Sequence, residues 1–255
     1  MRHYFRHFLL LVLLSLSMPS AIGDEYKILM RTSVQSLQRL SLTPNQAAFI
    51  KQQRQLNVGV THYDVPPFGM RNIRNEYEGL SADYTGLVAW QLNLPVNVKV
   101  FNSSEEAWQA LARGDIDLIP SVAAFPDNET FAFSLPYASD KPVLGLNDSD
   151  TAALAEDLHD TDVAMPRDYL PLSQAKATYP NARFRLFDSY QEALSAVAFG
   201  QSRVYLGNSY SLSRNYLNNI HVERLSRLAS RAVGFAVSQK NPQLLKLINA
   251  ACARR

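Results

Sequence analysis

Cysteine and histidine are scarce in this chain of 255 residues. The single cysteine, Cys252, excludes an intrachain disulfide framework and any zinc or iron–sulfur site built from cysteines. Beyond residue 23 the histidines are His62, His159 and His221, and their spacing offers no His-x-x-x-His pair for a metal. We therefore expect neither a metal nor a cofactor.

The chain also lacks a cluster of basic residues, a phosphate-binding loop and a dinucleotide-binding glycine motif. Its 25 Lys and Arg face 23 Asp and Glu, and without Arg2 and Arg6 the two signs balance at 23 each. This balance argues against nucleic acid as a partner. With 47% hydrophobic and 19% charged residues, the composition is that of a globular protein with one large domain or two small lobes.

The one long apolar run lies at the N-terminus. The first seven residues carry two arginines and no acid, residues 8–18 are almost all apolar, and Pro19 ends the run ahead of small residues. The run is short for a membrane span, so the pattern predicts a secretory signal peptide over residues 1–23, cleaved near Gly23. An uncleaved anchor is the alternative. We expect an exported protein that begins near Asp24.

One structural unit occurs twice. In the first copy, alternation at residues 96–100 predicts a strand, and Ser103 with Glu106 has the spacing of a helix capping box. Gly114 suits the left-handed conformation that ends a helix, and residues 116–119 form a short apolar strand. The copy is therefore a strand, a capped helix, a glycine and a second strand.

The second copy follows with the same spacing. Residues 184–187 predict a strand, Ser189 and Glu192 cap a helix, Gly200 ends it, and residues 204–206 form the closing strand. Each copy is a βαβ unit, which implies parallel pairing. Two copies predict two similar α/β lobes, and a single doubly wound sheet is the alternative.

Other elements fit around these units. Thr43 and Pro44 mark the start of a helix that reaches Gln53, and Ser81 caps a helix with an apolar face. Segment 24–42 is expected to form an extended arm. Further strands are expected at 56–60 and 163–165, and a further helix at 172–178.

Six short stretches follow one another along the chain: Leu42-Thr43-Pro44-Asn45-Gln46, Leu56-Asn57-Val58-Gly59-Val60, Pro66-Pro67-Phe68, Glu78-Gly79-Leu80-Ser81-Ala82-Asp83-Tyr84, Gly114-Asp115-Ile116-Asp117-Leu118 and Ser134-Leu135-Pro136-Tyr137. As an ordered set they resemble the family 3 periplasmic solute-binding proteins, which have the type II Venus-flytrap fold. The leading helix and the Glu78–Tyr84 stretch are most similar to the sensory domains of hybrid histidine kinases of the Bvg and Evg type. Uptake proteins of ABC transporters usually lack that leading helix.

The resemblance implies a periplasmic α/β protein of two lobes, each a mostly parallel sheet with flanking helices. We expect lobe 1 to hold residues 56–138 and 233–255, lobe 2 residues 139–232, and residues 24–55 to form the N-terminal arm and helix. Crossing strands near 138–141 and 232–236 would be the hinges. Family members continue with a further helix on lobe 1. We therefore expect a truncated C-terminal helix, a less stable lobe 1 and a Cys252 open to thiol reagents.

The resemblance also implies a small-molecule ligand in the cleft between the lobes, which closes around it. In lobe 1, Tyr63 and Phe68 are the candidates for an aromatic wall, although Phe68 packed under the Pro66-Pro67 turn is an equal alternative. Ser121 follows the closing strand, where family members hold a ligand carboxylate with a hydroxyl and backbone N–H groups.

Two neutral amides stand where amino-acid binders of the family carry charges. Asn128 occupies the place of the arginine in the Thr-Pro-Glu-Arg motif, and Asn208 the place of the aspartate that pairs with the ligand ammonium. An amide cannot match a charge-assisted, bidentate arginine–carboxylate contact. We therefore expect common L-amino acids to bind poorly, with plain loop roles for both residues as the alternative.

Arg167 and Tyr169 lie just before the helix expected at 172–178. The N-terminus of that helix is a place where an anion is favoured, and Arg167 would reinforce it. The alternative is a solvated ion pair of Arg167 with an aspartate.

Enzyme motifs are missing, and Asp115 and Asp117 are assigned a structural or surface role. Two functions remain. One is a sensory flytrap module that reports ligand occupancy to a sensor kinase, which the leading helix favours. The other is a free periplasmic receptor that delivers solute to an ABC permease. The sequence leaves a homodimer open.

Overall fold

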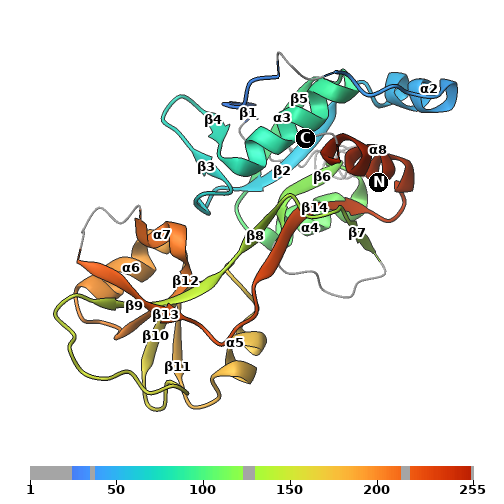
Figure 1. Ribbon diagram of the computed structural model, residues 1–255. Helices are drawn as coiled ribbons and strands as arrows, with labels where there is room; N and C mark the ends of the chain where they lie inside the picture. The colour runs from blue at the N-terminus through green and yellow to red at the C-terminus, as the bar shows by residue number, and fades with distance from the viewer. Residues whose placement is uncertain (1–24, 35–37, 123–129, 214–218, 254–255) are drawn as a thin grey trace, which may run out of the picture.

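The computed structural model describes residues 25–34, 38–122, 130–213 and 219–253, which form two α/β lobes (Figure 1). The larger sheet, in lobe 1, has the order β3-β4-β1-β5-β2-β6-β14-β7, with β8 paired to β14. Its strands are β1 (Glu25–Ile28), β2 (Leu56–Thr61), β3 (Met70–Arg71), β4 (Glu76–Glu78), β5 (Val96–Phe101), β6 (Leu118–Val122), β7 (Phe131–Phe133), β8 (Ala138–Asp140) and β14 (Arg231–Ser238).

The smaller sheet, in lobe 2, has the order β11-β10-β12-β9-β13. Its strands are β9 (Pro142–Asn147), β10 (Asp162–Pro166), β11 (Arg183–Phe187), β12 (Val204–Asn208) and β13 (Ile220–Leu225). The helices are α2 (Pro44–Gln53), α3 (Leu80–Leu92), α4 (Ser104–Arg113), α5 (Leu172–Thr178), α6 (Tyr190–Ala198), α7 (Ser209–Ser213) and α8 (Pro242–Cys252).

The repeated unit is present in both lobes, with one correction to its pairing. The strands of each unit run parallel, but they are not neighbours: β2 lies between β5 and β6, and β10 lies between β11 and β12. The strand–helix–strand pattern fixes the parallel direction and leaves room for an intervening strand. The expectation of mostly parallel sheets needs a correction, because both sheets are mixed. In lobe 1, β14 runs antiparallel to β6, β7 and β8, and in lobe 2, β9 runs antiparallel to β12 and β13.

The predicted caps of the repeat form in both copies. The Ser103 hydroxyl accepts a hydrogen bond from the backbone N–H of Glu106 at 3.2 Å, and Gly114 ends α4 with φ 87°. The carboxylate of Glu106 accepts from the N–H of Asn102, one residue before the expected partner, at 3.1 Å. Both bonds satisfy amides at the helix start. The second copy repeats the pattern at Asp188, Ser189, Glu192 and Gly200.

The start of α3 differs from the prediction. Gly79 is the N-cap, with φ 115°, and a Cβ there would lie 2.6 Å from the carbonyl oxygen of Phe68. The close backbone approach therefore requires a residue without a side chain. Ser81 lies inside the helix and is buried, and its hydroxyl is 2.8 Å from the Tyr137 hydroxyl. Leu80, the first residue of the helix, is exposed.

The N-terminal arm contributes a strand to lobe 1. β1 pairs in parallel with β4 and antiparallel with β5, so the segment expected to be merely extended widens the sheet. The carboxylate of Asp83 then accepts hydrogen bonds from the backbone N–H groups of Arg31 at 2.6 Å and Thr32 at 3.2 Å. The helix α2 has the predicted bounds, with Thr43 as its N-cap. The predicted signal peptide lies outside the described residues.

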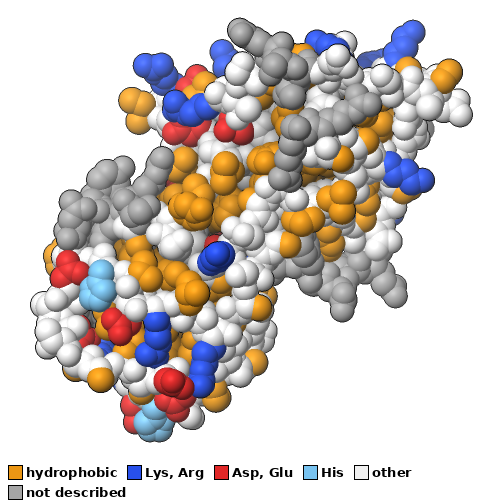
Figure 2. All heavy atoms as spheres, in the orientation of Figure 1, with side chains coloured by type: hydrophobic (Ala, Val, Ile, Leu, Met, Phe, Trp, Pro, Cys, Tyr) orange, Lys and Arg blue, Asp and Glu red, His pale blue; other side chains and the backbone are white. Residues whose placement is uncertain are grey.

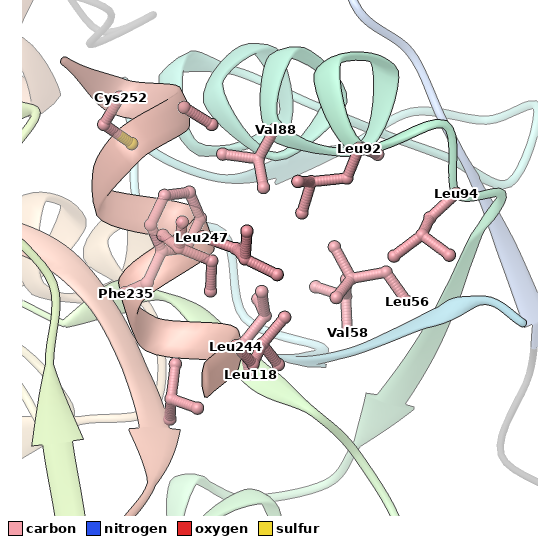
Figure 3. Packing of buried hydrophobic residues seen from close by; sticks show 14 of the residues in the cluster. Leu56, Val58, Val88, Leu92, Leu94, Leu118, Phe235, Leu244, Leu247 and Cys252 are labelled. Carbon is pink, nitrogen blue, oxygen red and sulfur yellow. The ribbon is translucent and has the colours of Figure 1, made fainter. Parts of the chain in front are cut away.

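The core of lobe 1 includes α8 (Figure 3). Leu244 and Leu247 are fully buried against α3 and β2, and Gln91 donates a hydrogen bond to the carbonyl of Ala251 at 2.9 Å. Cys252 is 3% exposed, so the expectation of an accessible thiol is wrong. Cys252 is the last residue of α8 and belongs to the buried core cluster of lobe 1.

Two carboxylates near the first repeat have the structural roles predicted for them. Asp117 accepts hydrogen bonds from the backbone N–H of Asn57 at 2.7 Å and from the amide of Gln53 at 2.7 Å, which ties α2 to the sheet. Asp115 pairs with Arg113 at 2.8 Å on the surface.

The strands β8 and β14 run side by side between the two sheets (Figure 1). Their register pairs Arg231 with Asp140 and Val233 with Ala138. The whole sheet of lobe 2 lies between these strands in the sequence. No helix within the described ranges is long and apolar enough to cross a membrane.

Candidate functional site

A cavity of about 540 Å³ opens between the lobes. Thr61, Ser121 and Asn208 line it at the carboxyl ends of β2, β6 and β12, and Arg167 follows the end of β10. Ligands of open α/β sheets bind outside these strand ends, and the volume falls within the range of small-molecule sites. In the face shown in Figure 2, hydrophobic side chains gather where the two lobes meet.

Aromatic side chains form much of the lobe 1 wall. Tyr63 and Phe68, the residues predicted from the sequence, both line the cavity. Phe68 is also buried in the core of lobe 1, so the two alternatives for it are compatible. The wall includes Tyr77 and Trp108, which sequence reasoning missed. Trp108 lies on α4 with its ring centroid 4.7 Å from that of Phe131.

Asn208 joins the two lobes. Its amide nitrogen donates a hydrogen bond to the carbonyl of Pro66 in lobe 1 at 2.9 Å. Its amide oxygen accepts from the N–H of Ser211 at 2.8 Å and from the hydroxyl of that serine at 3.0 Å. Asn208 is 2% exposed, and these bonds use most of the capacity of its amide. Contact between Asn208 and a ligand stays a prediction.

Arg167 lines the cavity from lobe 2 as part of an ion pair. Its Nε donates to the carboxylate of Asp188 at 3.1 Å, and both side chains are more than half exposed. Such a pair contributes little to stability. The helix α5 behind it has Pro171 as its N-cap and only seven residues, so it provides no developed anion site. Asn128 lies outside the described residues.

A buried polar cluster lies at the base of the cavity, and of its three members the sequence singled out only Tyr169. Asp140 at the end of β8, Arg231 at the start of β14, and Tyr169 before α5 form this crossing-strand cluster. They are 1%, 9% and 8% exposed. Arg231 forms an ion pair with Asp140, donates to the carbonyl of Tyr169 at 2.6 Å, and lies with its Cζ 4.3 Å from the centroid of that ring.

Each member of this cluster has a polar atom that is almost completely shielded from solvent: Oδ1 of Asp140, Nε of Arg231 and the hydroxyl of Tyr169. Burial, and then the charge of Asp140, raise the pKa of Tyr169 far above its ordinary value, so its hydroxyl stays protonated. Asp140 and Arg231 lie 91 residues apart, which is why no local pattern linked them. One signal could have revealed the pair: Asp140 lies in one of the two expected hinge strands, and Arg231 directly precedes the other.

The negative and positive side chains that line the cavity are equal in number. In the described part of the chain they are the acids Asp140 and Asp168 and the bases Arg167 and Arg231. The same part contains no group of three or more His, Cys, Asp or Glu residues placed to hold a metal ion.

The sequence profile of the bacterial extracellular solute-binding proteins, family 3, matches residues 56–255, and the chain belongs to this family. It is 31% identical over 237 residues to the virulence sensor protein BvgS of Bordetella bronchiseptica, and 22% identical over 227 residues to the sensor protein EvgS of Escherichia coli O157:H7. These matches cover 91% and 87% of the chain but 19% of each relative, so the chain spans about a fifth of their length.

The fold agrees with these matches. The crystal structure of the B. pertussis BvgS periplasmic domain is similar with a TM-score of 0.76 and 30% identity, over 91% of this chain and 46% of that one. The two-lobed Venus-flytrap fold and the resemblance to the Bvg and Evg sensors are therefore confirmed.

Proposed function

We propose that the chain is a sensory Venus-flytrap module, in which a small molecule bound between the lobes sets the state passed to a signalling partner. The observation that carries this proposal is the cavity of about 540 Å³, lined from both lobes and from the strands that connect them. The BvgS and EvgS relatives, both sensor proteins, support signalling as the output.

In this proposal, binding of the ligand changes how the two lobes are oriented relative to each other. The two sheets are joined by β8 and β14, so the lobes rotate about these strands while each core stays intact. A ligand that touches both walls stabilises the closed arrangement, because only there are all its contacts made. The Asn208–Pro66 hydrogen bond adds to that arrangement from the protein side.

The residues around the cavity favour binding over chemistry. Its described lining contains no histidine, cysteine, lysine or glutamate, so it lacks the usual general base beside a nucleophile. One buried carboxylate, that of Asp140, is already paired with Arg231. We therefore propose a ligand-binding role without catalysis, carried out in the periplasm after export.

The signalling partner is proposed to be a sensor kinase, in line with the relatives. Delivery of solute to an ABC permease is the second candidate, supported by membership of the solute-binding family. Both functions use the same cavity.

A ligand screen with a blocked cavity tests the proposal. Thermal unfolding of the purified protein is measured against a library of small metabolites. A ligand at 100 times its Kd stabilises the folded state by about 2.7 kcal/mol. Two variants fill the cavity from opposite lobes, Ser121→Phe and Gln174→Phe. Ser195→Phe on α6, away from the cavity, is the control.

We expect stabilising compounds to lose their effect in both cavity variants and to keep it in the control. Unfolding without ligand verifies that each variant is folded. A screen with no stabilising compound, or stabilisation that persists in both cavity variants, would contradict a ligand-binding function at this cavity.

A further inference from the structure

Residues 62–71 of lobe 1 form a lip at the junction between the lobes, called the cavity lip below. Tyr63 and Phe68 of this lip line the cavity. The carbonyl of Pro66, at its tip, accepts the hydrogen bond from Asn208 of lobe 2 at 2.9 Å. The position of the cavity lip therefore affects both the aromatic wall and the contact that joins the lobes.

The cavity lip ends in β3, and the hairpin of β3 and β4 reaches the sheet of lobe 1 through the N-terminal arm. The strand order is β3-β4-β1-β5, so β1 lies between this hairpin and β5 (Figure 1). The backbone N–H groups of Lys27 and Leu29 donate to the carbonyls of Asn75 at 3.0 Å and Tyr77 at 2.8 Å. Among the described strands, β4 pairs only with β1 and β3. Without β1, the hairpin would have no strand that connects it to the sheet.

One side chain links the cavity lip to β1. Nη1 of Arg71 in β3 donates to the hydroxyl of Tyr26 in β1 at 3.2 Å, and the Cζ of Arg71 lies 5.6 Å from the centroid of that ring. Nη2 of the same guanidinium donates to the carbonyl of His62. The backbone N–H of Arg71 donates to the carboxylate of Asp64 at 2.9 Å. Arg71 therefore holds the two ends of the cavity lip together and ties them to β1.

The link lies behind the wall of the cavity. Tyr26 and Arg71 are half-buried, and neither of them lines the cavity. The bonds of a guanidinium are charge-assisted and stronger than those between neutral groups, and partial burial protects them from screening by water. An effect of Tyr26 or Arg71 on the cavity must therefore pass through the position of the lip.

We propose that seating of β1 in the sheet and closure of the lobes are coupled, because Tyr26 and Arg71 hold the cavity lip where Pro66 meets Asn208. Tyr26 and Arg71 are positioning residues, which act through the lip without touching a ligand. Coupling between two sites is reciprocal, so the seated strand favours closed lobes and closed lobes favour the seated strand. A displacement of the N-terminal arm opens the cavity.

The first test disturbs the link from the side of the arm. Tyr26→Phe removes the hydroxyl that accepts from Arg71 and keeps the ring, whereas Arg71→Met removes the charge and its donors and keeps an unbranched side chain. We expect Tyr26→Phe to lower the ratio of closed to open molecules by about twofold to tenfold, the effect of one hydrogen bond, and Arg71→Met to lower it at least as much. Small-angle X-ray scattering without ligand should show a larger radius of gyration for both.

Arg39 provides the matched control, because it also joins the N-terminal arm to lobe 1. Its Nη1 donates to the carbonyl of Trp90 at 3.0 Å and to Oδ1 of Asn93 at 2.6 Å, and its Cζ lies 5.1 Å from the centroid of the Trp90 ring. Neither partner lines the cavity. We expect Arg39→Met to lower stability against denaturant, as Arg71→Met does, and to leave the scattering unchanged. The unfolding curves also verify that each variant is folded.

The second test disturbs the link from lobe 2. Asn208→Asp removes the donor of the bond between the lobes. Reciprocal coupling then predicts faster hydrogen exchange at the amides of Lys27 and Leu29, which hold β1 to the hairpin in lobe 1. Asn147→Asp alters a bond inside lobe 2 and serves as the control. We expect it to leave the exchange of both amides unchanged.

The outcomes decide the coupling without a ligand. Unchanged scattering in a folded Tyr26→Phe or Arg71→Met variant, or an equal change in Arg39→Met, would overturn it. Equal exchange of the β1 amides in Asn208→Asp and the parent protein would also overturn it, since a merely structural role of β1 does not respond to a change in lobe 2. The proposed ligand-binding function is decided separately, by the metabolite screen with the two cavity variants.

Discussion

The hydrogen bond between Asn208 and Pro66 links the two lobes, so we expect that replacing one atom of Asn208 shifts the equilibrium between closed and open molecules. In Asn208→Asp the retained oxygen still accepts from Ser211, but the nitrogen that donates to the carbonyl of Pro66 becomes a carboxylate oxygen. Two acceptors then face each other where a bond of 2.9 Å was made. Separation of the lobes relieves this conflict because water reaches both groups.

The magnitude follows from the burial of the bond. Leaving a buried acceptor unsatisfied costs about 1–3 kcal/mol. A change of this size lowers the ratio of closed to open molecules by about five- to 150-fold. We expect the radius of gyration from small-angle X-ray scattering, measured without ligand at pH 7, to rise in the variant.

Asn147 in lobe 2 offers a closely matched control. Its amide nitrogen donates to the carbonyl of Ala198 at 2.9 Å, and its oxygen accepts from the N–H and hydroxyl of Ser149. All these groups belong to lobe 2, so Asn147→Asp makes the same exchange without touching the junction. Scattering that is unchanged in Asn208→Asp, or that changes equally in Asn147→Asp, would refute the reasoning.

Two further predictions concern single groups. Cys252 is the last residue of α8 and is buried in the core of lobe 1, so it should resist a thiol reagent such as 5,5′-dithiobis(2-nitrobenzoate) in the native protein and react once the protein is unfolded; rapid labelling of native protein would contradict this packing. The hydrogen bond from Arg203 lowers the pKa of Asp150 below 3.8, so this carboxylate adds stability above that pH and the contribution is lost as the pH falls through the lowered value. Denaturant unfolding should show a stability advantage over Asp150→Asn that is constant at neutral pH and shrinks in acid; a difference independent of pH would be inconsistent with the pair.

Local signals in the sequence were sufficient for the repeated units. Ser103 and Ser189 each precede a glutamate by three residues and a glycine by eleven. Both serines are N-caps, and a left-handed glycine ends the first helix as Gly114 and follows the C-cap of the second as Gly200. Capping and glycine conformations depend on neighbouring residues alone, so the chain specifies them without reference to the rest of the fold. The order of the strands in the sheets could not be predicted from neighbouring residues, because β2 inserts into the first unit and β10 into the second.

Short strands, and contacts between residues far apart in the sequence, could not be predicted because they leave no local sequence pattern. β3 and β4 contain two and three residues, too few for an alternating pattern, and β1 pairs with strands far along the chain. Tertiary packing also overrode the expected cap at Ser81, since the backbone of Phe68 leaves space only for Gly79. At the site, six of the seven predicted residues line the cavity, and the seventh lies outside the described residues.

The same tertiary contacts determine how strongly a ligand can act on the lobes. The bond between Asn208 and Pro66 uses protein atoms on both sides, so it favours the closed arrangement whether or not the cavity is filled. A ligand shifts the equilibrium only by the difference in its affinity for the closed and open arrangements. Under the proposed function, that difference would come from contacts to both lobes at once, for example to Trp108 of lobe 1 and Tyr169 of lobe 2, which both line the cavity. A molecule that reaches only one of them binds without changing the shape of the protein.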